Sequence, residues 1–504
     1  MAERAQESNP PVATVRGLLS PEHTGPALID VDGRAIDHPT LCQEVDRLAA
    51  AMRAAGLKRN DRLAIVLPNG PEMVITLLAA MTVGCAAPLN PKYREDEFRF
   101  YLDDLNAAAM IATEGTAADA RAAMPETTIA LDLRSNDGVP EIVNLVSSAG
   151  ATTAETPGAD DQALVLHTSG TTSRPKIVPL RQRNLATSAR NIAAHLGLTA
   201  RDRSLTVMPL FHIHGIMAAM LAPLSVGGAV IATTGFDAFK MHRWIDELQP
   251  TYYSAVPTMH QLVLARAPAR RTTSLRFVRS SSAALPGTVF DGLVELFDVP
   301  VVEAYGMTEA SHQMTSNPLP PPTDKRGSVG IAAGIEVGII DGSGNELPPL
   351  TRGEVAIKGA TVVDGYENNP DANASAFTNG WFRTGDEGML DEEGYLFLTG
   401  RLKEQINRGG EKISPLEIEE IALTHAEVKE TVAFAIPHDK LGEDVGLAVV
   451  RSDGSQLTDR ELRDYLSARM AAFKVPRQIV FLHEIPKGAT GKLQRIGLAG
   501  RLGL

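Results

Sequence analysis

The string HTSGTTSRPK at residues 167–176 combines residue types that can bind phosphate. Hydroxyl side chains surround Gly170 and the string ends in Lys176, so hydrogen-bond donors and one positive charge stand where the backbone can approach an anion closely. It is not a Walker A loop, because Pro175 occupies the place of the glycine that precedes the lysine there. The composition alone would also suit a surface turn rich in Ser and Thr. We therefore predict a loop that binds nucleotide phosphates, with a plain turn as the alternative.

Five further strings follow the first in a fixed order and extend to the end of the chain. They are PLFHIHG at 209–215, EAYGMTE at 303–309, WFRTGD at 381–386, GRLKE at 400–404 and PKGATGK at 486–492. Together, the six strings resemble the signature motifs of the acyl-adenylate-forming superfamily, which includes acyl-CoA synthetases, peptide synthetase adenylation domains and luciferase. Within it, the stretches 171–176, 211–215, 316–320 and 406–415 are similar to the oxalyl-CoA synthetases, and bacterial fatty-acid CoA ligases share much of this pattern.

The resemblance implies an enzyme that converts a carboxylic acid, ATP and coenzyme A into acyl-CoA, AMP and pyrophosphate through an acyl-adenylate. Attack of a carboxylate on the α-phosphate brings two anions together and therefore needs positive charge around the reacting phosphorus. By resemblance, Lys492 bridges the carboxylate and the α-phosphate, Thr308 contacts the α-phosphate and Glu309 holds Mg²⁺. His212 stands at the position where an aromatic residue controls entry of the thiol. Outside its motif, Lys492 would be taken for a solvated surface lysine.

The other residues implied by the resemblance bind the nucleotide, the thiol or the acyl group. ATP and AMP contacts are expected at Thr168, Ser169, Gly170, Thr171, Thr172, Lys176, Ser282, Ala283, Glu303, Ala304, Tyr305, Asp386 and Arg401; coenzyme A contacts at Arg408, Gly409 and Gly410; and an acyl pocket at His214, Ser280, Met307 and His312. Tyr305 is expected to stack on adenine, and Asp386 and Arg401 to bind the ribose hydroxyls. Asp386 alone would suit a turn. Lys403 is expected to be a hinge about which a small domain rotates between the two half-reactions.

The size of the acyl group is left open by the sequence, which allows oxalate, a fatty acid or a natural-product acid. His214, His312 and Ser280 would suit a small second carboxylate, which favours oxalate. A metal pair at His212 and His214 is not expected, because a zinc site needs a third ligand and no cluster of Cys or His supplies one.

One residue departs from the family pattern, since Ile177 stands where relatives have glycine after the loop lysine. A β-branched residue is unfavourable at positive φ. One alternative is therefore a CoA ligase impaired in adenylation, which thioesterifies an acyl-adenylate supplied by a partner enzyme. The other is that Ile177 begins the next strand with ordinary geometry. A further alternative is an adenylating enzyme that loads a carrier protein.

Helical and strand patterns alternate along the chain, which is typical of a parallel α/β fold. Helices are expected at 41–52 and 71–82, and strands at 63–67, 163–166, 204–208, 229–233, 252–255, 275–278 and 299–303. From residue 327, glycine-rich turns at 341–344 and 391–394 indicate a β-rich subdomain. Helices at 415–423 and 459–469 and strands at 431–436, 447–450 and 478–482 follow. We expect a large domain of two α/β layers plus the β-rich subdomain at 1–400, and a small, mobile α+β domain at 401–504.

Composition places the chain among globular proteins. Of the 504 residues 44% are hydrophobic, and 48 basic against 61 acidic residues give a net charge of −13, which argues against a protein that coats nucleic acid. Two cysteines are too few for a disulfide framework, and the amino-terminal residues lack the order of a signal peptide, so a cytoplasmic protein is expected. The apolar stretches 74–89 and 215–232 are too short for a membrane span and predict a buried helix followed by a strand.

Overall fold

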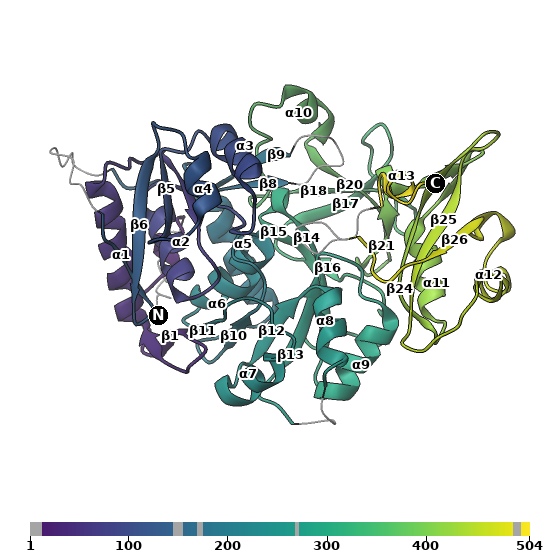
Figure 1. Cartoon of the computed structure of the whole chain (residues 1–504), viewed down its shortest axis with the longest axis horizontal. Helices are drawn as coiled ribbons and strands as arrows, with labels where there is room; N and C mark the ends of the chain where they lie inside the picture. Colours follow the sequence, from purple (N-terminus) through teal and green to yellow (C-terminus); the bar gives the residue numbers. More distant parts are fainter. Residues whose placement is uncertain (1–12, 145–154, 169–174, 268–271, 487–494) are drawn as a thin grey trace, which may run out of the picture.

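Two large sheets with helices between and outside them form about the first two-thirds of the chain (Figure 1). The computed structural model describes residues 13–144, 155–168, 175–267, 272–486 and 495–504. Within these residues the first sheet has seven strands, in the order β7 (Val139–Ile142), β6 (Ile129–Asn136), β5 (Ala109–Thr113), β3 (Arg62–Val66), β4 (Cys85–Pro88), β8 (Gln162–Thr168) and β9 (Lys176–Arg181). The second has nine, in the order β16 (Ile331–Ala332), β15 (His312–Ser316), β14 (Val301–Met307), β13 (Phe277–Ser281), β12 (Tyr252–Ala255), β10 (Arg203–Thr206), β11 (Ala229–Ala232), β1 (Pro26–Ile29) and β2 (Ala35–Asp37).

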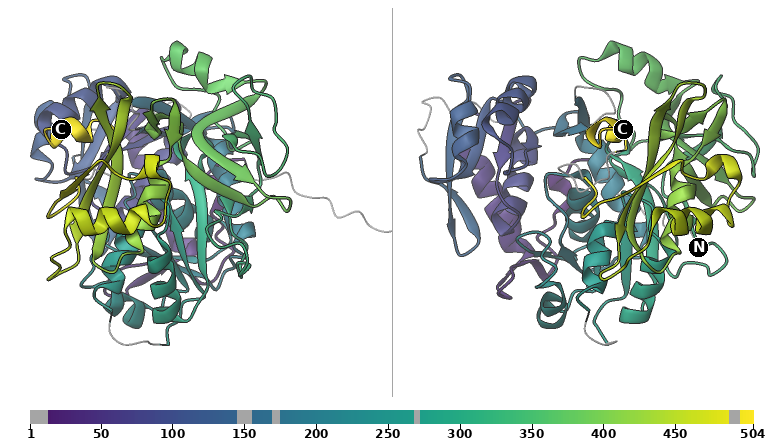
Figure 2. Two further views of the ribbon diagram at one scale, coloured as in Figure 1. Left: turned by 90° about the vertical axis from the view of Figure 1, so that its right-hand side faces the viewer. Right: turned by 45° about the vertical axis from the view of Figure 1, so that its right-hand side comes forward.

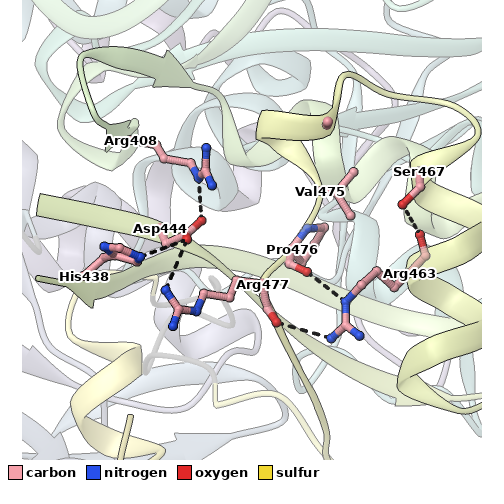
Figure 3. Close-up of a pocket in the computed structure, with 9 residues that line it drawn as sticks. Arg408, His438, Asp444, Arg463, Ser467, Val475, Pro476 and Arg477 are labelled. Carbon is pink, nitrogen blue, oxygen red and sulfur yellow. Dashed lines mark hydrogen bonds and ion pairs between the residues drawn. The ribbon is translucent and has the colours of Figure 1, made fainter. Parts of the chain in front are cut away.

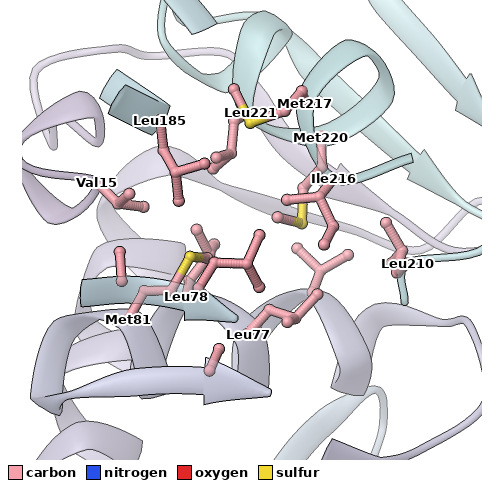
Figure 4. Close-up of a cluster of buried hydrophobic side chains, with 14 of the residues drawn as sticks. Val15, Leu77, Leu78, Met81, Leu185, Leu210, Ile216, Met217, Met220 and Leu221 are labelled. Carbon is pink, nitrogen blue, oxygen red and sulfur yellow. The ribbon is translucent and has the colours of Figure 1, made fainter. Parts of the chain in front are cut away.

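The buried side chains divide the large part into five layers of helix and sheet. The central layer holds α1 (His38–Ala54), α2 (Pro71–Val83), α5 (Gln182–His195) and the π-helical segment η2 (Gly215–Leu221), whose apolar side chains share one core with both sheets (Figure 4). On the outer faces lie α3 (Glu95–Leu105) and α4 (Ala118–Ala123) on the first sheet, and α7 (Met241–Leu248), α8 (Pro257–Leu264) and α9 (Gly287–Phe297) on the second. Along β3, Leu63 and Ile65 face the central layer and Ala64 and Val66 face the outer one, as the two-residue period of a strand requires.

The expected elements of the large part are present, with bounds shifted by a few residues. The apolar stripe Leu41, Val45, Leu48 and Met52 is fully buried on α1, which ends just before Gly56. The strand expected at 252–255 is β12, while the one expected at 275–278 is β13 and begins two residues later, at Phe277. Both long apolar stretches form a buried helical segment followed by a strand, namely α2 with β4 and η2 with β11. In the described part of the chain, no helix combines the length and the apolar character needed to cross a membrane.

Two smaller sheets follow. One consists of β17 (Glu336–Ile340), β18 (Gly353–Lys358), β20 (Trp381–Leu390), β19 (Phe377–Thr378) and β21 (Leu396–Arg401), with α10 (Pro370–Ala376) beside it. The last sheet consists of β23 (Glu411–Ile413), β22 (Ile406–Arg408), β25 (Gly442–Arg451), β24 (Val428–His438) and β26 (Gln478–Phe481), with α11 (Pro415–Leu423), α12 (Asp459–Ser467) and α13 (Leu498–Arg501). This last group, which we call the C-terminal lobe, lies at the end of the molecule away from α1 (Figures 1 and 2). The α/β class and the smaller α+β part agree with the sequence prediction.

Candidate functional site

The string EAYGMTE forms the end of β14 and the single turn of 3-10 helix η3 (Thr308–Ala310) that follows it. Gly306 is needed at the close approach of β14 to β15, because a Cβ there would lie 1.8 Å from the carbonyl oxygen of His312. The strand register then sets Met307 opposite His312. Ala304 is buried, while Glu303, Tyr305 and Thr308 are only partly buried. One strand thus presents residues expected for the nucleotide, the reacting phosphate and the acyl group.

Tyr305, Asp386 and Arg401 form one hydrogen-bonded group. The Tyr305 hydroxyl donates to Asp386 Oδ2 at 2.5 Å, and Arg401 Nε donates to Asp386 Oδ1 at 2.7 Å. Burial and then the Asp386 charge raise the pKa of Tyr305 well above its ordinary value. Burial alone would lower the pKa of Arg401, but Asp386 raises it, so the arginine stays charged. The strand pair β20–β21 sets Asp386 directly opposite Arg401, which explains how residues from two separate motifs meet.

A second group joins Lys176, Tyr366 and Glu309. The Nζ atom of Lys176, at the start of β9, lies 4.3 Å from the centre of the Tyr366 ring, and the Tyr366 hydroxyl donates to Glu309 Oε1 at 2.8 Å. Burial lowers the pKa of Lys176; the charge of Glu309 opposes this shift and that of Lys403 adds to it. Burial and then Glu309 raise the pKa of Tyr366, which keeps its hydroxyl a donor. The loop lysine, the acidic residue of η3 and the expected hinge lysine are thereby close to one another.

Ile177 has ordinary strand geometry. It lies in β9 opposite His167, its side chain is buried against the outer layer with Val165 and Phe98, and its φ is not positive. Its carbonyl oxygen accepts a hydrogen bond from the backbone N–H of Glu367. Of the two interpretations of this departure, the structure therefore supports the one in which Ile177 begins a strand.

Buried polar side chains gather beside β14, at the carboxyl ends of β12 and β13. His214 bonds Ser254 Oγ through Nε2 at 2.7 Å and Ser282 Oγ through Nδ1 at 3.1 Å, and its ring stacks on that of His312 with centres 4.9 Å apart. The hydroxyl of Ser282, which is expected behind the adenine, contacts His214 of the expected acyl pocket. Ser280 Oγ is buried without a hydrogen-bond partner among the described residues. We call His214, Ser254, Arg279, Ser280, Ser282, His312 and Gln313 the polar cluster.

Arg279 is the fully buried cation of the polar cluster. Its Nη1 donates to Ser254 Oγ at 3.0 Å and lies 3.4 Å from His214 Nε2, and its Nη2 donates to Gln313 Oε1 at 3.0 Å. It forms no ion pair with a carboxylate in the part of the chain that the structure describes, and its Nε has no hydrogen-bond partner there. Burial lowers the pKa of Arg279 to about 10, so the guanidinium is still charged at neutral pH. The site therefore holds a buried positive charge that no carboxylate of the described residues neutralises.

The expected coenzyme A residues lie in a hairpin of the C-terminal lobe. Arg408 ends β22 and Glu411 begins β23, so Gly409 and Gly410 form a two-residue turn with φ of 61° and 98°. The N–H of Gly409 donates to the carbonyl oxygen of Leu441, and Arg408 Nε donates to Asp444 Oδ1 at 2.7 Å. These contacts, of which Figure 3 shows that of Arg408 with Asp444, are all within the lobe, and no hydrogen bond or ion pair given for the described residues joins the hairpin to the nucleotide residues.

Arg495, just after the last motif in the sequence, bonds to the segment that follows the expected hinge. Its Nη1 donates to Glu404 Oε2 at 2.7 Å, while its Nη2 and Nε donate to the two oxygens of Glu419 at 2.7 and 3.0 Å. Glu404 ends the turn η4 (Leu402–Glu404), and Glu419 is buried on α11. Residue 495 comes three positions after Lys492, which lies outside the described residues.

The remaining site residues expected from the sequence lie in or beside the segments already described, or outside the described residues. Ser169, Gly170, Thr171, Thr172 and Lys492 lie outside the described residues. Thr168 ends β8 opposite Lys176, Ala283 follows β13, and His212 packs against the Phe211 ring ahead of η2. In the described part of the chain, no group of three or more His, Cys, Asp or Glu could hold a metal ion. The roles assigned to the individual residues stay predictions.

Sequence reasoning missed Tyr366 and Arg279. Tyr366 gave no signal, because its partner Glu309 is 57 positions away. Arg279 did give one, since it is a charged residue on a strand in the middle of the second sheet, where both faces are covered by helices and apolar residues are expected.

Known proteins match this chain over nearly its whole length. The AMP-binding enzyme family matches residues 21–367 and the AMP-binding enzyme C-terminal domain matches residues 417–492. The oxalate–CoA ligase of Arabidopsis thaliana is 42% identical over 473 residues, which are 91% of this chain and 92% of that protein. The oxalate–CoA ligase of Saccharomyces cerevisiae is 41% identical over 466 residues, 87% and 86% of the two chains. The ATP-bound crystal structure of MatB from Rhodopseudomonas palustris has a TM-score of 0.87 at 29% identity and covers 97% of this chain and 98% of that one.

The chain therefore belongs to the AMP-binding enzyme family, within the acyl-adenylate-forming superfamily, as its motifs predicted. It is an acyl-CoA ligase, an AMP-forming acid–thiol ligase. The comparisons do not favour an enzyme that loads a carrier protein or one that depends on a partner for its acyl-adenylate.

Proposed function

We propose that this acyl-CoA ligase activates oxalate, with ATP and coenzyme A as its other substrates. The observation that carries the proposal is the buried charge of Arg279, which has no carboxylate partner among the described residues. Placing an uncompensated charge in a protein interior is unfavourable, and a bound carboxylate would remove that penalty. The names of the plant and yeast relatives point to the same acid.

In this proposal, oxalate binds with one carboxylate toward the polar cluster and the other toward the ATP α-phosphate. His214 and Ser280 contact the first carboxylate. Arg279, whose Nη1 lies beside His214 Nε2, stabilises that carboxylate by electrostatic attraction. A fatty acid would place methylene groups against this cluster, and Ser280 Oγ and the Arg279 charge would then gain no acceptor. The cluster therefore selects for a second acidic group and against an aliphatic chain.

The adenylate is formed between β14 and the Lys176 group. Thr308 and Lys176 contact the phosphates, while Tyr305, Asp386 and Arg401 bind the adenosine. Attack of one oxalate oxygen on the α-phosphorus forms the acyl-phosphate bond and breaks the bond to pyrophosphate. Glu309 fits a magnesium site, because Mg²⁺ in phosphate-transfer sites is held by one or two carboxylates together with substrate phosphates. Bound there, Mg²⁺ would neutralise charge on the leaving pyrophosphate.

We also propose that residues 1–400 and 401–504 act as two domains that change their relative orientation about Lys403. Lys492 has to leave the adenylate before a thiol can attack its carbonyl carbon and release AMP. The contacts of Arg495 with Glu404 and Glu419 support this, because they join the chain at residue 495 to the segment after Lys403 and to α11.

The proposal is tested by ATP–pyrophosphate exchange over a panel of acids. Oxalate is expected to support exchange, whereas hexanoate, octanoate and a bulky polycyclic acid are not. Exchange with medium-chain acids but not with oxalate would refute the substrate assignment. Adding coenzyme A to the oxalate reaction should then release AMP and oxalyl-CoA, without any partner enzyme. Transfer from synthetic oxalyl-adenylate without any exchange would instead support the impaired-adenylation alternative.

A further inference from the structure

Tyr366, whose side chain contacts Lys176 and Glu309, lies in an irregular segment between β18 and α10. The structure describes all of residues 359–369, which form turns and bends. The backbone of such a segment is not fixed by the hydrogen bonds of a helix or a sheet, so other contacts have to hold it. Tyr366 is nevertheless buried, with 9% of its surface exposed. The contacts of its backbone therefore decide where its ring and its hydroxyl lie.

The side-chain amide of Asn373 holds the backbone of Tyr366 from one side. Its Oδ1 accepts a hydrogen bond from the Tyr366 N–H at 2.7 Å, and its Nδ2 donates to the Tyr366 carbonyl oxygen at 2.8 Å. The amide can come this close because residue 365 is glycine, where a Cβ would lie 2.9 Å from Asn373 Oδ1. Asn373 is on α10, whose start is fixed by the Asn369 cap and by Pro370. One side chain of α10 thus fixes both backbone polar groups of Tyr366.

The residue after Tyr366 is held by the first large sheet. The Glu367 N–H donates to the carbonyl oxygen of Ile177 at 3.1 Å, and Arg62 Nη2, from β3, donates to Glu367 Oε2 at 2.5 Å. Ile177 directly follows Lys176 in β9, so this backbone contact keeps the Tyr366 segment beside the lysine. Tyr366 is therefore held on one side by the sheet that carries Lys176 and on the other by α10.

We propose that Asn373 is a positioning residue for the binding of magnesium–ATP. Acting through Tyr366, it holds the ring beside Lys176 and the hydroxyl against Glu309. The inference rests on the proposed function, which assigns that lysine to the phosphates and that glutamate to Mg²⁺, and it adds a residue that none of the six motifs includes. Without the Asn373 contacts, the Glu309 carboxylate would lose the fixed donor that orients it.

The test measures equilibrium binding of magnesium–ATP and of AMP to the full-length enzyme, without acid or coenzyme A. Asn373→Ala is expected to weaken the binding of magnesium–ATP about tenfold, because a hydrogen bond to the charged Glu309 is no longer held in place. Binding of AMP, which lacks the β- and γ-phosphates, should not change, and it reports that the variant is folded. Ser375→Ala is the matched control, because this exposed residue of α10 bonds through its hydroxyl to carbonyl oxygens of its own helix. Both of its affinities should match those of the wild type.

A double substitution tests whether Asn373 acts through Tyr366. In a Tyr366→Phe background, where the hydroxyl is already absent, Asn373→Ala should weaken magnesium–ATP binding by no more than about a further twofold, because both changes remove the same contact. Effects that multiply to about a hundredfold would show that Asn373 acts elsewhere and would overturn the proposal.

Equal weakening of magnesium–ATP and AMP by Asn373→Ala, or of neither, would also overturn it. Lys176→Ala separates this result from a failure of the proposed function. If Lys176→Ala binds magnesium–ATP as the wild type does, the phosphate contact assigned to Lys176 is wrong, and the inference fails with it. If Lys176→Ala weakens this binding and Asn373→Ala does not, only the inference is wrong. Because these measurements need no acid, they do not depend on the oxalate assignment.

Discussion

Arg279 is the residue at which stability and specificity conflict most clearly. Its guanidinium is wholly buried, its pKa is lowered to about 10 by that burial, and its hydrogen bonds go to neutral or weakly basic groups. Buried arginines normally pair with a carboxylate, because the desolvation penalty is otherwise not offset. In the absence of ligand, the protein therefore retains a charge that reduces its stability and that a substrate carboxylate can neutralise.

Replacing Arg279 by an uncharged residue should lower the activity without lowering the stability of the protein. Arg279→Met keeps much of the side-chain volume and removes the penalty, so we expect the thermal midpoint to stay the same or rise. ATP–pyrophosphate exchange with oxalate should fall about a hundredfold or more, because the buried ion pair between Arg279 and the bound oxalate is lost. The control is Arg276→Met, which removes the ion pair of a partly exposed arginine to buried Asp202. That variant should lower the thermal midpoint and leave acid selectivity unchanged; a large destabilisation by Arg279→Met would contradict our interpretation.

The hydroxyl of Tyr366 should affect the binding of magnesium–ATP more than the transfer of the acyl group to the thiol. Tyr366→Phe removes the hydrogen bond to Glu309 and keeps the ring beside Lys176. A hydrogen bond to a charged group contributes about 1.5–3 kcal/mol, so the KM for magnesium–ATP should rise about tenfold. Thiol transfer from synthetic oxalyl-adenylate should not change. Tyr395→Phe is the control, because its ring also lies beside a lysine, with Lys325 Nζ 5.0 Å from the ring centre; an equal effect of both variants would disprove the role of the hydroxyl.

Among the elements, those with strong local signals were predicted best. α2 begins at Pro71 and ends one residue before Gly84, and its uninterrupted apolar sequence matches burial on all sides. The strands β1 and β2 were not predicted, because they have four and three residues and β1 pairs with β11, some 200 positions later. Patterns of hydrophobicity carry no information on such distant pairing. For the same reason the motifs gave the right order of site residues but not the contact of Arg279 with His214, 65 positions apart.

The junction of β14 and β15 should be the element least tolerant of added volume. Gly306→Ala would place a methyl group 1.8 Å from the His312 carbonyl oxygen, which forces the two strands apart. Overpacking of this kind costs about 1–3 kcal/mol or more, and the shift would also move Met307 and Thr308. We expect a lower thermal midpoint and loss of exchange activity. Gly342→Ala, where a Cβ meets no atom within 4 Å, is the matched control and should change neither; equal behaviour of the two variants would disprove the close approach.

At the scale of the whole molecule, an acidic group of the second large sheet interacts with one of the C-terminal lobe. Glu303 of β14 and Glu420 of the C-terminal lobe interact electrostatically, with Arg326 as the nearby cation. Burial raises the pKa of Glu303 to about 7, and burial followed by the charge of Glu417 raises that of Glu420. The acidic charge of the chain thus reaches into its interior, where Arg279 is a buried cation with no carboxylate partner among the described residues.

The contact between β14 and the C-terminal lobe should make stability depend on pH. A carboxyl whose pKa is 4.5 when unfolded and about 7 when folded binds more protons in the folded state, so its contribution is greatest below pH 4.5 and is lost as pH rises to about 7. The total loss is at most about 3 kcal/mol. Glu303→Gln, which cannot ionise, should match the wild type at pH 5 and have a higher thermal midpoint at pH 8. Exposed Glu295→Gln on α9 is the control and should follow the wild type at both values. A difference in stability between Glu303→Gln and wild type that stays constant from pH 5 to pH 8 would show that Glu303 is ionised throughout. In that case β14 and the C-terminal lobe would meet without a protonated carboxyl group between them.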